Sequence, residues 1–139
     1  MSGKDLILAA KEARKKAYCP YSGFAVGAAL LTEDGRVFTG CNIENASFGA
    51  TCCAERVALF SAIASGAKKF AGLAIVGGKT DEEALFAPCP PCGICRQALS
   101  EFCTSDFPIY LSDGNAIKTI RFDALLPMRF SAEQFEKRN

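Results

Sequence analysis

The first apolar positions of the chain recur at the spacing of an α-helix. They lie three or four residues apart and would share one face: Leu6, Ala10, Ala13 and Ala17. Ser2 stands before this pattern, where its hydroxyl can cap the first turn, and Cys19-Pro20 follows it, where a helix cannot continue. The pattern therefore predicts an N-terminal helix.

Three shorter apolar stretches predict β-strands. Residues 26–31 and 37–41 flank a Glu-Asp-Gly-Arg turn and together indicate a β-hairpin. Residues 72–76 form a continuous apolar run, which is typical of a central strand covered on both faces.

Two longer segments predict helices. Residues 51–65 end at Gly66, a common residue just after a helix, and beyond the first turn they are apolar almost all round. We therefore expect this helix to be buried. Residues 93–102 predict another helix, after a polar loop. The remaining predicted elements are strands at 108–111 and 116–120, joined by a turn at 112–115, and helical pieces at 122–126 and 131–136.

The order of these elements predicts an α/β fold. A hairpin followed by helix, strand, helix and strand favours one mixed central sheet of about five strands between helices on both faces, a three-layer α/β/α arrangement. The length of 139 residues suits a single domain over residues 1–139. In such folds, ligands bind at the carboxyl ends of strands, beside helix N-termini.

The amino-acid composition indicates which kinds of binding partner the protein can have. Sixteen basic and fifteen acidic residues give a net charge of +1, so the basic path that nucleic-acid binding requires is not indicated. We interpret the basic residues of the first helix as a solvated face: Lys11, Arg14, Lys15 and Lys16. No apolar run is long enough for a signal peptide or a membrane span, so we expect a cytosolic protein without a membrane partner.

The chain contains eight cysteines and no histidine. In a reducing compartment, cysteines serve as metal ligands or small buried residues more often than as disulfides. Because histidine is absent, a transition-metal site must use thiolates and carboxylates, and a histidine-based catalytic triad is excluded.

Two cysteine clusters stand at predicted helix N-termini. Cys92 and Cys95 form a Cys-x-x-Cys pair after Pro91, and Cys53 opens the earlier helix. A Cys-x-x-Cys pair lets two sulfurs converge on one tetrahedral ion, and a helix N-terminus favours thiolates. Taken alone, the pair fits a redox dithiol or two buried cysteines as well as a metal site. Cys53 would add a third ligand and leave the fourth position of a catalytic zinc to water.

Glu55 stands two residues after Cys53, close enough to reach a water on the metal. The helix dipole alone can explain a glutamate in a first turn. Burial at the head of an apolar helix would also raise its pKa into the range of a general acid–base catalyst. Cys-x-Glu followed by Pro-Cys-x-x-Cys is the all-cysteine form of the zinc nucleobase deaminase signature, in which the glutamate transfers protons. We therefore expect Glu55 to be catalytic, with one Zn²⁺ per subunit on Cys53, Cys92 and Cys95.

Two further cysteines compete for the ligand positions. Cys52 adjoins Cys53, and Cys89 forms a second Cys-x-x-Cys with Cys92. Cys53 is preferred because it alone has a glutamate two residues later, and we interpret Cys52 and Cys89 as neighbours of the site. The other cysteines are interpreted as small core residues: Cys19, Cys41 and Cys103.

Three more segments, besides the zinc motif, resemble segments of a known protein family. They read Tyr-Cys-Pro-Tyr-Ser-Gly-Phe-Ala-Val-Gly at 18–27, Gly-Cys-Asn-Ile-Glu-Asn-Ala at 40–46 and Leu-Leu-Pro-Met-Arg-Phe at 125–130. With them, the chain resembles the small homotetrameric cytidine deaminases from its first helix almost to its C-terminus. The resemblance implies a cytidine deaminase-like fold and hydrolytic deamination of free cytidine and deoxycytidine in pyrimidine salvage. It also implies a homotetramer whose sites are shared between subunits.

The resemblance also implies roles for single residues in substrate binding. Asn42 and Glu44 would hydrogen-bond the sugar hydroxyls, with Ile43 between them in the binding segment. Phe24 would pack on the nucleoside, and the backbone of Ala54 would hold polar atoms of the base. As alternatives, the two polar residues could be ordinary strand-end residues, and the phenylalanine a plain core aromatic.

Three further roles follow from the resemblance. Phe130 and Phe48 would reach into the site of a neighbouring subunit, although Phe48 stands where the family often has tyrosine and so lacks a hydroxyl. Arg56 would hydrogen-bond the zinc-ligating thiolates and offset the formal charge of −1 that three thiolates give a Zn²⁺ site. The alternatives are a core aromatic for Phe130 and a surface salt bridge for the arginine.

Three other functions are compatible with part of the sequence features described above. A deaminase of another cytosine-containing nucleoside, such as a nucleoside antibiotic, would carry the same zinc motif, although the Asn-Ile-Glu-Asn stretch at 42–45 favours an ordinary nucleoside sugar. An enzyme that edits RNA or DNA is disfavoured by the near-neutral charge. A structural zinc module would close the site with a fourth ligand, Cys52 or Cys89. The sequence does not distinguish cytidine from deoxycytidine.

Overall fold

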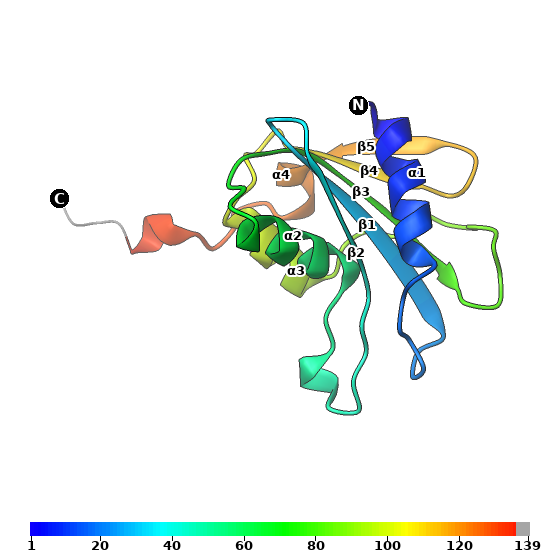
Figure 1. The fold of residues 1–139 in the computed structure, drawn as a ribbon. Coiled ribbons are helices and arrows are strands. Elements are labelled where there is room, and N and C mark those ends of the chain that lie inside the picture. Colours follow the sequence, from blue (N-terminus) through cyan, green and yellow to red (C-terminus); the bar gives the residue numbers. More distant parts are fainter. Residues whose placement is uncertain (136–139) are drawn as a thin grey trace.

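The computed structural model describes residues 1–135. Glu136, the last residue of the predicted C-terminal helical piece, lies outside the described residues. Five strands form one sheet in the order β2-β1-β3-β4-β5 (Figure 1). Their bounds are Phe24–Thr32 for β1, Val37–Cys41 for β2, Phe70–Lys79 for β3, Pro108–Ser112 for β4 and Ile117–Arg121 for β5. The mixed sheet predicted from the order of the elements is therefore confirmed.

The sheet combines both kinds of strand pairing. Strand β1 runs antiparallel to β2 and to β3, and β4 runs antiparallel to β5. Only β3 and β4 are parallel, and the chain that crosses between them contains helix α3, Gly93–Ser100. The carboxyl end of β3 therefore leads towards the N-terminus of α3, where the cysteine pair lies.

Helices cover both faces of the sheet (Figure 1). Helix α1, Gly3–Arg14, packs over Ala74 and Val76, whereas α2, Ala54–Ala64, belongs to the core on the opposite face with Leu73 and Ile75. All four of these β3 side chains are completely buried. Because successive strand residues point to opposite faces, burial on both faces requires the continuous apolar run seen in the sequence.

Helix α1 begins and ends with polar side-chain contacts. Its capping box is complete, since Ser2 accepts from the backbone N–H of Asp5 and the Asp5 carboxylate accepts from the backbone of Ser2. At the other end, Arg14 Nε donates to the carbonyl of Ala25 at 3.0 Å, and Nη2 donates to that of Lys79 at 2.7 Å. The interpretation of a solvated basic face is therefore wrong for Arg14, which ties α1 to the ends of β1 and β3.

Helix α2 differs from its prediction in two ways. It begins at Ala54 rather than at residue 51, because Cys52 forms a two-way backbone bridge with Ile43 before the helix starts. The expected complete burial is also wrong: Phe60 is half exposed. The reason is that α2 packs against the sheet and α3 on one side only.

The described part of the chain closes with two short helical pieces. Helix α4, Phe122–Leu125, packs Phe122 into the core, and a 3₁₀ turn follows at Ala132–Gln134. The segment after α4 extends away from the body of the molecule (Figure 1). Within the described residues, no helix is long and apolar enough to cross a membrane.

Candidate metal centre and active site

The N-termini of α2 and α3 bring three cysteines together. Cys53 immediately precedes α2 and Cys92 immediately precedes α3; neither side chain caps its helix, so both sulfurs remain available as ligands. Cys95 lies in the first turn of α3 and is fully buried. The three sulfurs lie within 4.8 Å of one another, and residues 1–135 contain no other group of this kind. These residues could therefore hold one metal ion.

The sulfur positions fit zinc. Zn–S bonds of about 2.3 Å in a tetrahedral site place two sulfurs about 3.8 Å apart. The Sγ atoms of Cys53 and Cys92 are 3.7 Å apart. A zinc ion held by these three cysteines would have one ligand position left for water, as catalytic rather than structural zinc sites do.

The electrostatics of the cluster favour a thiolate at Cys53. Hydrogen bonds from the Cys95 thiol, and then from Arg56, lower the pKa of Cys53 to about 5. Arg56 Nη2 lies 3.5 Å from Cys53 Sγ, and the buried Arg56 Nε has no hydrogen-bond partner. Within the described part of the chain, Arg56 forms no ion pair with a carboxylate, so the surface salt-bridge alternative is not observed.

Glu55 enters the same cluster from the first turn of α2. Its side chain is only 4% exposed, and burial, reinforced by the neighbouring Cys53 thiolate, raises the pKa of the carboxyl group to about 7. This is the direction that the sequence predicted. A carboxyl group with that pKa can both accept and donate a proton near neutral pH.

The two competing cysteines stay outside the sulfur cluster. Cys89 Sγ packs against Gly77, so closely that a Cβ atom added to this glycine would stand 2.7 Å from the sulfur. Burial raises the pKa of the Cys89 thiol to about 11. Burial also raises the pKa of Cys52, whose backbone pairs with Ile43.

The three cysteines interpreted as core residues differ in burial. Cys19 and Cys103 are buried as predicted, whereas Cys41 is only partly buried. Cys41 ends the edge strand β2, where no further strand covers it.

The segment after β2 lies directly beside Cys53. Ile43 donates to and accepts from the backbone of Cys52, both at 2.9 Å. Gly40 makes this approach possible, because a Cβ atom there would stand 2.5 Å from the carbonyl oxygen of Ala54. Ala54, the first residue of α2, is completely buried at this contact. The predicted sugar-binding segment and the cluster of three cysteines therefore lie next to each other.

Asn42 is buried and makes two hydrogen bonds to β1. Its Oδ1 accepts from the N–H of Val26, and its Nδ2 donates to the carbonyl of Phe24, both at 2.8 Å. Phe24 is 40% exposed, and its ring lies 2.9 Å from where a Cβ atom of Gly77 would stand. Asn42 thus fixes the backbone that carries Phe24.

Glu44 holds the loop before β1. Its Oε1 accepts from the backbone N–H groups of Tyr21 at 2.9 Å and Ser22 at 3.0 Å, and its Oε2 accepts from the Ser22 hydroxyl. The sequence prediction missed Ser22, although it stands inside the Tyr-Ser-Gly-Phe stretch that carries part of the resemblance. These bonds lower the pKa of Glu44, the Ser22 hydroxyl contributing most.

The two residues expected to reach a neighbouring subunit are exposed. Phe48 is 75% exposed and contacts the ring of Tyr21 edge-on, with centroids 5.9 Å apart. Phe130 is 57% exposed, and its carbonyl accepts from Gln97 Nε2 at 2.9 Å. Exposure leaves both rings available for contacts outside this chain.

The chain is similar to proteins of one known family. A family model described as the cytidine and deoxycytidylate deaminase zinc-binding region matches residues 2–111. A cytidine deaminase of Sporosarcina psychrophila is 46% identical over 134 residues, which cover 96% of this chain and 94% of that relative. The crystal structure of a cytidine deaminase from Burkholderia pseudomallei matches with a TM-score of 0.84 and 47% identity, over 94% of this chain and 100% of the other. A blasticidin-S deaminase of Bacillus cereus is 30% identical over 108 residues, 76% of each chain.

The fold, the group of three cysteines and the relatives together define a zinc-binding hydrolytic deaminase. The chain belongs to the cytidine and deoxycytidylate deaminase family.

Proposed function

We propose that this protein deaminates free cytidine and deoxycytidine hydrolytically, giving uridine or deoxyuridine and ammonia, in cytosolic pyrimidine salvage. The observation that carries the proposal is the buried Glu55 carboxyl group beside three sulfurs that lie within 4.8 Å of one another. Relatives with 46% identity are cytidine deaminases, whereas the blasticidin-S deaminase is less similar, at 30%. Neither Cys52 nor Cys89 joins the sulfur group, which disfavours a closed structural zinc module.

In this proposal, Cys53, Cys92 and Cys95 hold one Zn²⁺ per chain. When bound, the zinc supplies a Lewis acid that lowers the pKa of water. Glu55 takes a proton from the attacking water and passes it to the ring nitrogen of the base. It then takes the second proton, from the hydroxyl group added to the ring carbon, and passes it to the amino group, which leaves as ammonia. Its pKa of about 7 suits both directions of transfer. Arg56 and the N-termini of α2 and α3 stabilise the negative charge of the thiolates.

The substrate would lie across the segments that precede α2. Phe24 packs on the nucleoside, the backbone of Ala54 holds the base, and Asn42 and Glu44 bind the sugar hydroxyls with Ile43 between them. Asn42 and Glu44 also hold the backbone around Phe24, so one hydrogen-bonded unit supports the contacts to both sugar and base.

The proposed assembly is a homotetramer in which neighbouring chains complete each site. Phe48 and Phe130 supply the shared contacts, which their exposed fractions of 75% and 57% leave possible. Both residues stand in segments outside the sheet and its three covering helices.

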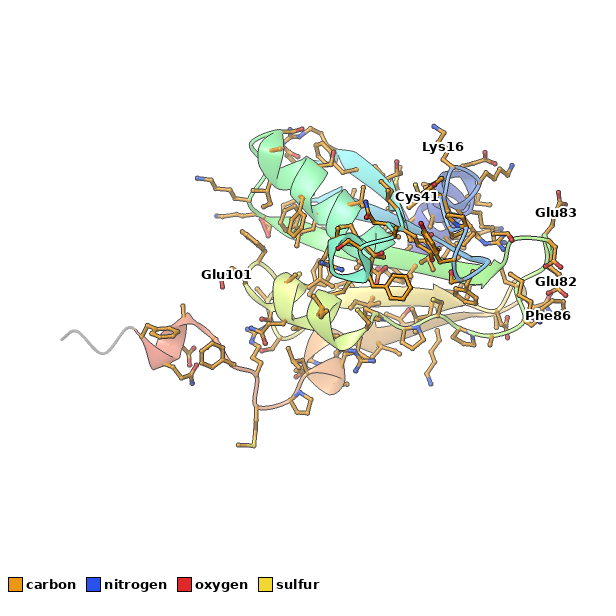
Figure 2. The ribbon with its side chains drawn as sticks, turned by 90° about the horizontal axis from the view of Figure 1, so that it is seen from below. Lys16, Cys41, Glu82, Glu83, Phe86 and Glu101 are labelled. Atoms are coloured by element: carbon orange, nitrogen blue, oxygen red, sulfur yellow. The ribbon has the colours of Figure 1, made fainter. Side chains whose placement is uncertain are left out.

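The test is the loss of the cytidine absorbance band when zinc-loaded protein is mixed with cytidine. We expect loss with the wild type, and none with Glu55→Gln or with zinc-depleted protein. Glu101→Gln is the matched control, because Glu101 is exposed at the far end of α3 (Figure 2). A wild type that holds one zinc per chain and leaves cytidine and deoxycytidine unchanged would refute the proposed substrate.

A further inference from the structure

Arg96 joins the backbone just before α3 to the end of α4. It follows Cys95 in α3, yet its guanidinium group donates to two carbonyls rather than to sulfur. Nε donates to the carbonyl of Pro91 at 2.8 Å, and Nη1 donates to that of Leu125, also at 2.8 Å. The proposed chemistry uses neither of these hydrogen bonds.

The first hydrogen bond acts on the backbone of a metal ligand. The Pro91 carbonyl belongs to the planar peptide unit that ends at the nitrogen of Cys92, so its direction helps to set the backbone torsion of Cys92. The backbone N–H of Arg96 donates to the carbonyl of Cys92 at 2.9 Å. Arg96 therefore holds the carbonyl groups on both sides of the Cys92 α-carbon.

Cys92 is the ligand that most needs such support. Cys95 is fully buried and Cys53 partly buried, so packing restrains both side chains, whereas Cys92 is exposed. Its side chain also makes no capping hydrogen bond to α3. The position of the Cys92 sulfur thus depends on the backbone around it more than that of either other ligand.

The second hydrogen bond links the same backbone to the C-terminal segment. Leu125 is the last residue of α4, where carbonyl groups lack helical partners, and Arg96 satisfies one of them. The next residue, Gln97, donates to the carbonyl of Phe130 at 2.9 Å. Helix α3 therefore holds the C-terminal segment with residues that follow directly after the Cys-x-x-Cys pair.

We propose that Arg96 is a positioning residue that sets the place of the Cys92 sulfur for the metal and anchors that backbone to the end of α4. The inference rests on the proposed function only in that the three thiolates bind zinc. It does not depend on which amine the protein deaminates.

The test measures zinc release from the full-length holoprotein to a chromophoric chelator. Arg96→Gln should release zinc roughly tenfold faster than the wild type, as expected for loss of an outer contact to a ligand. Arg96→Lys should fall between them, because an ammonium group lacks the fork that reaches two carbonyls. The matched control is Arg121→Gln, which removes an exposed ion pair with Asp123 and should leave release unchanged.

A second readout separates positioning from general stability. In Co²⁺-substituted protein, thiolate-to-metal charge-transfer and d–d bands report the ligand geometry, and they should shift in Arg96→Lys but not in Arg121→Gln. Thermal unfolding of the zinc-free variants shows whether each variant is folded. If Arg96→Gln is not folded, Arg96→Lys alone is used for the test.

Two results would overturn the inference. One is zinc release and cobalt spectra of the Arg96 variants equal to those of Arg121→Gln. The other is a wild type that binds neither metal. A protein that binds zinc with the expected dependence on Arg96, yet does not deaminate cytidine, would support this inference and refute the proposed substrate.

Discussion

Arg56 provides the positive charge nearest to the thiolate cluster. Its Nη2 lies 3.5 Å from the sulfur of Cys53, and three thiolates on Zn²⁺ would carry a formal charge of −1. Replacing Arg56 with glutamine should lower zinc affinity by roughly tenfold and reduce turnover, because the negative charge loses its partner. Metal content after dialysis and the initial rate with cytidine measure the two effects. Wild-type values for both the metal content and the initial rate would show that the helix N-termini alone stabilise the negative charge of the thiolates.

Glu44 should make stability depend on pH in the acidic range. The Ser22 hydroxyl, and then backbone N–H groups, hold its pKa below the ordinary 4.5 in the folded protein. Because the folded pKa is depressed, the stabilising contribution is complete above pH 4.5 and is lost as the pH falls through the folded pKa. The difference in melting temperature between wild type and Glu44→Gln should therefore shrink on acidification below that value.

This difference is measured on zinc-free protein, so that acid release of the metal does not contribute. Ser22→Ala removes one of the three donors to the carboxylate and should reduce the effect. A difference that stays constant with pH would mean that the carboxylate charge contributes nothing to these hydrogen bonds.

The close approach of β2 and α2 depends on one glycine. A Cβ atom at Gly40 would stand 2.5 Å from both the carbonyl oxygen of Ala54 and the N–H nitrogen of Ala58, which are backbone atoms and cannot rotate away. Gly40→Ala should therefore push α2 outward, lower the free energy of unfolding by about 3 kcal/mol, and weaken zinc binding at Cys53. Chemical unfolding and zinc content test this.

Gly49→Ala is the matched control, because nothing lies within 4 Å of the added atom there. Equal stability of the two alanine variants would show that the helix can move without cost. Loss of stability without loss of zinc would show that the start of α2 keeps its place independently of the β2 contact.

Sequence patterns predicted the elements better than their ends. The continuous burial of β3 follows from the apolar run at 72–76 alone. The start of α2 does not, because it depends on the backbone bridge between Cys52 and Ile43. Such a bridge uses backbone N–H and C=O groups, which all residues except proline carry, so no residue type in the sequence indicates it.

The same limit applies to the site. The spacing of its cysteines and Glu55 predicted a cluster that the structure brings together, since the chemistry of these side chains is specific. Other hydrogen bonds of the site have backbone partners far away in the sequence. Asn42 accepts from the N–H of Val26, 16 positions away, and Arg96 donates to the carbonyl of Leu125, 29 positions away. Their contribution becomes visible only in the folded chain.

The whole molecule leaves apolar side chains exposed in several places. Phe60 on the outer side of α2 is 50% exposed, and Phe130 on the C-terminal segment is 57% exposed. The proposed homotetramer would explain why α2, apolar almost all round, does not bury all of its sides within one chain.

Shared sites predict that two variants with different defects can restore activity when they are mixed. Phe130→Ala should lower kcat/KM about tenfold through loss of an aromatic contact, and Glu55→Gln should abolish turnover. In randomly mixed assemblies, about a quarter of the sites would combine an intact Glu55 with an intact Phe130 from a neighbouring chain. Activity measured after co-refolding the two variants should therefore exceed the average of the separate preparations. If Phe130 instead serves only its own chain, mixing would add nothing, because every chain would still carry one of the two defects.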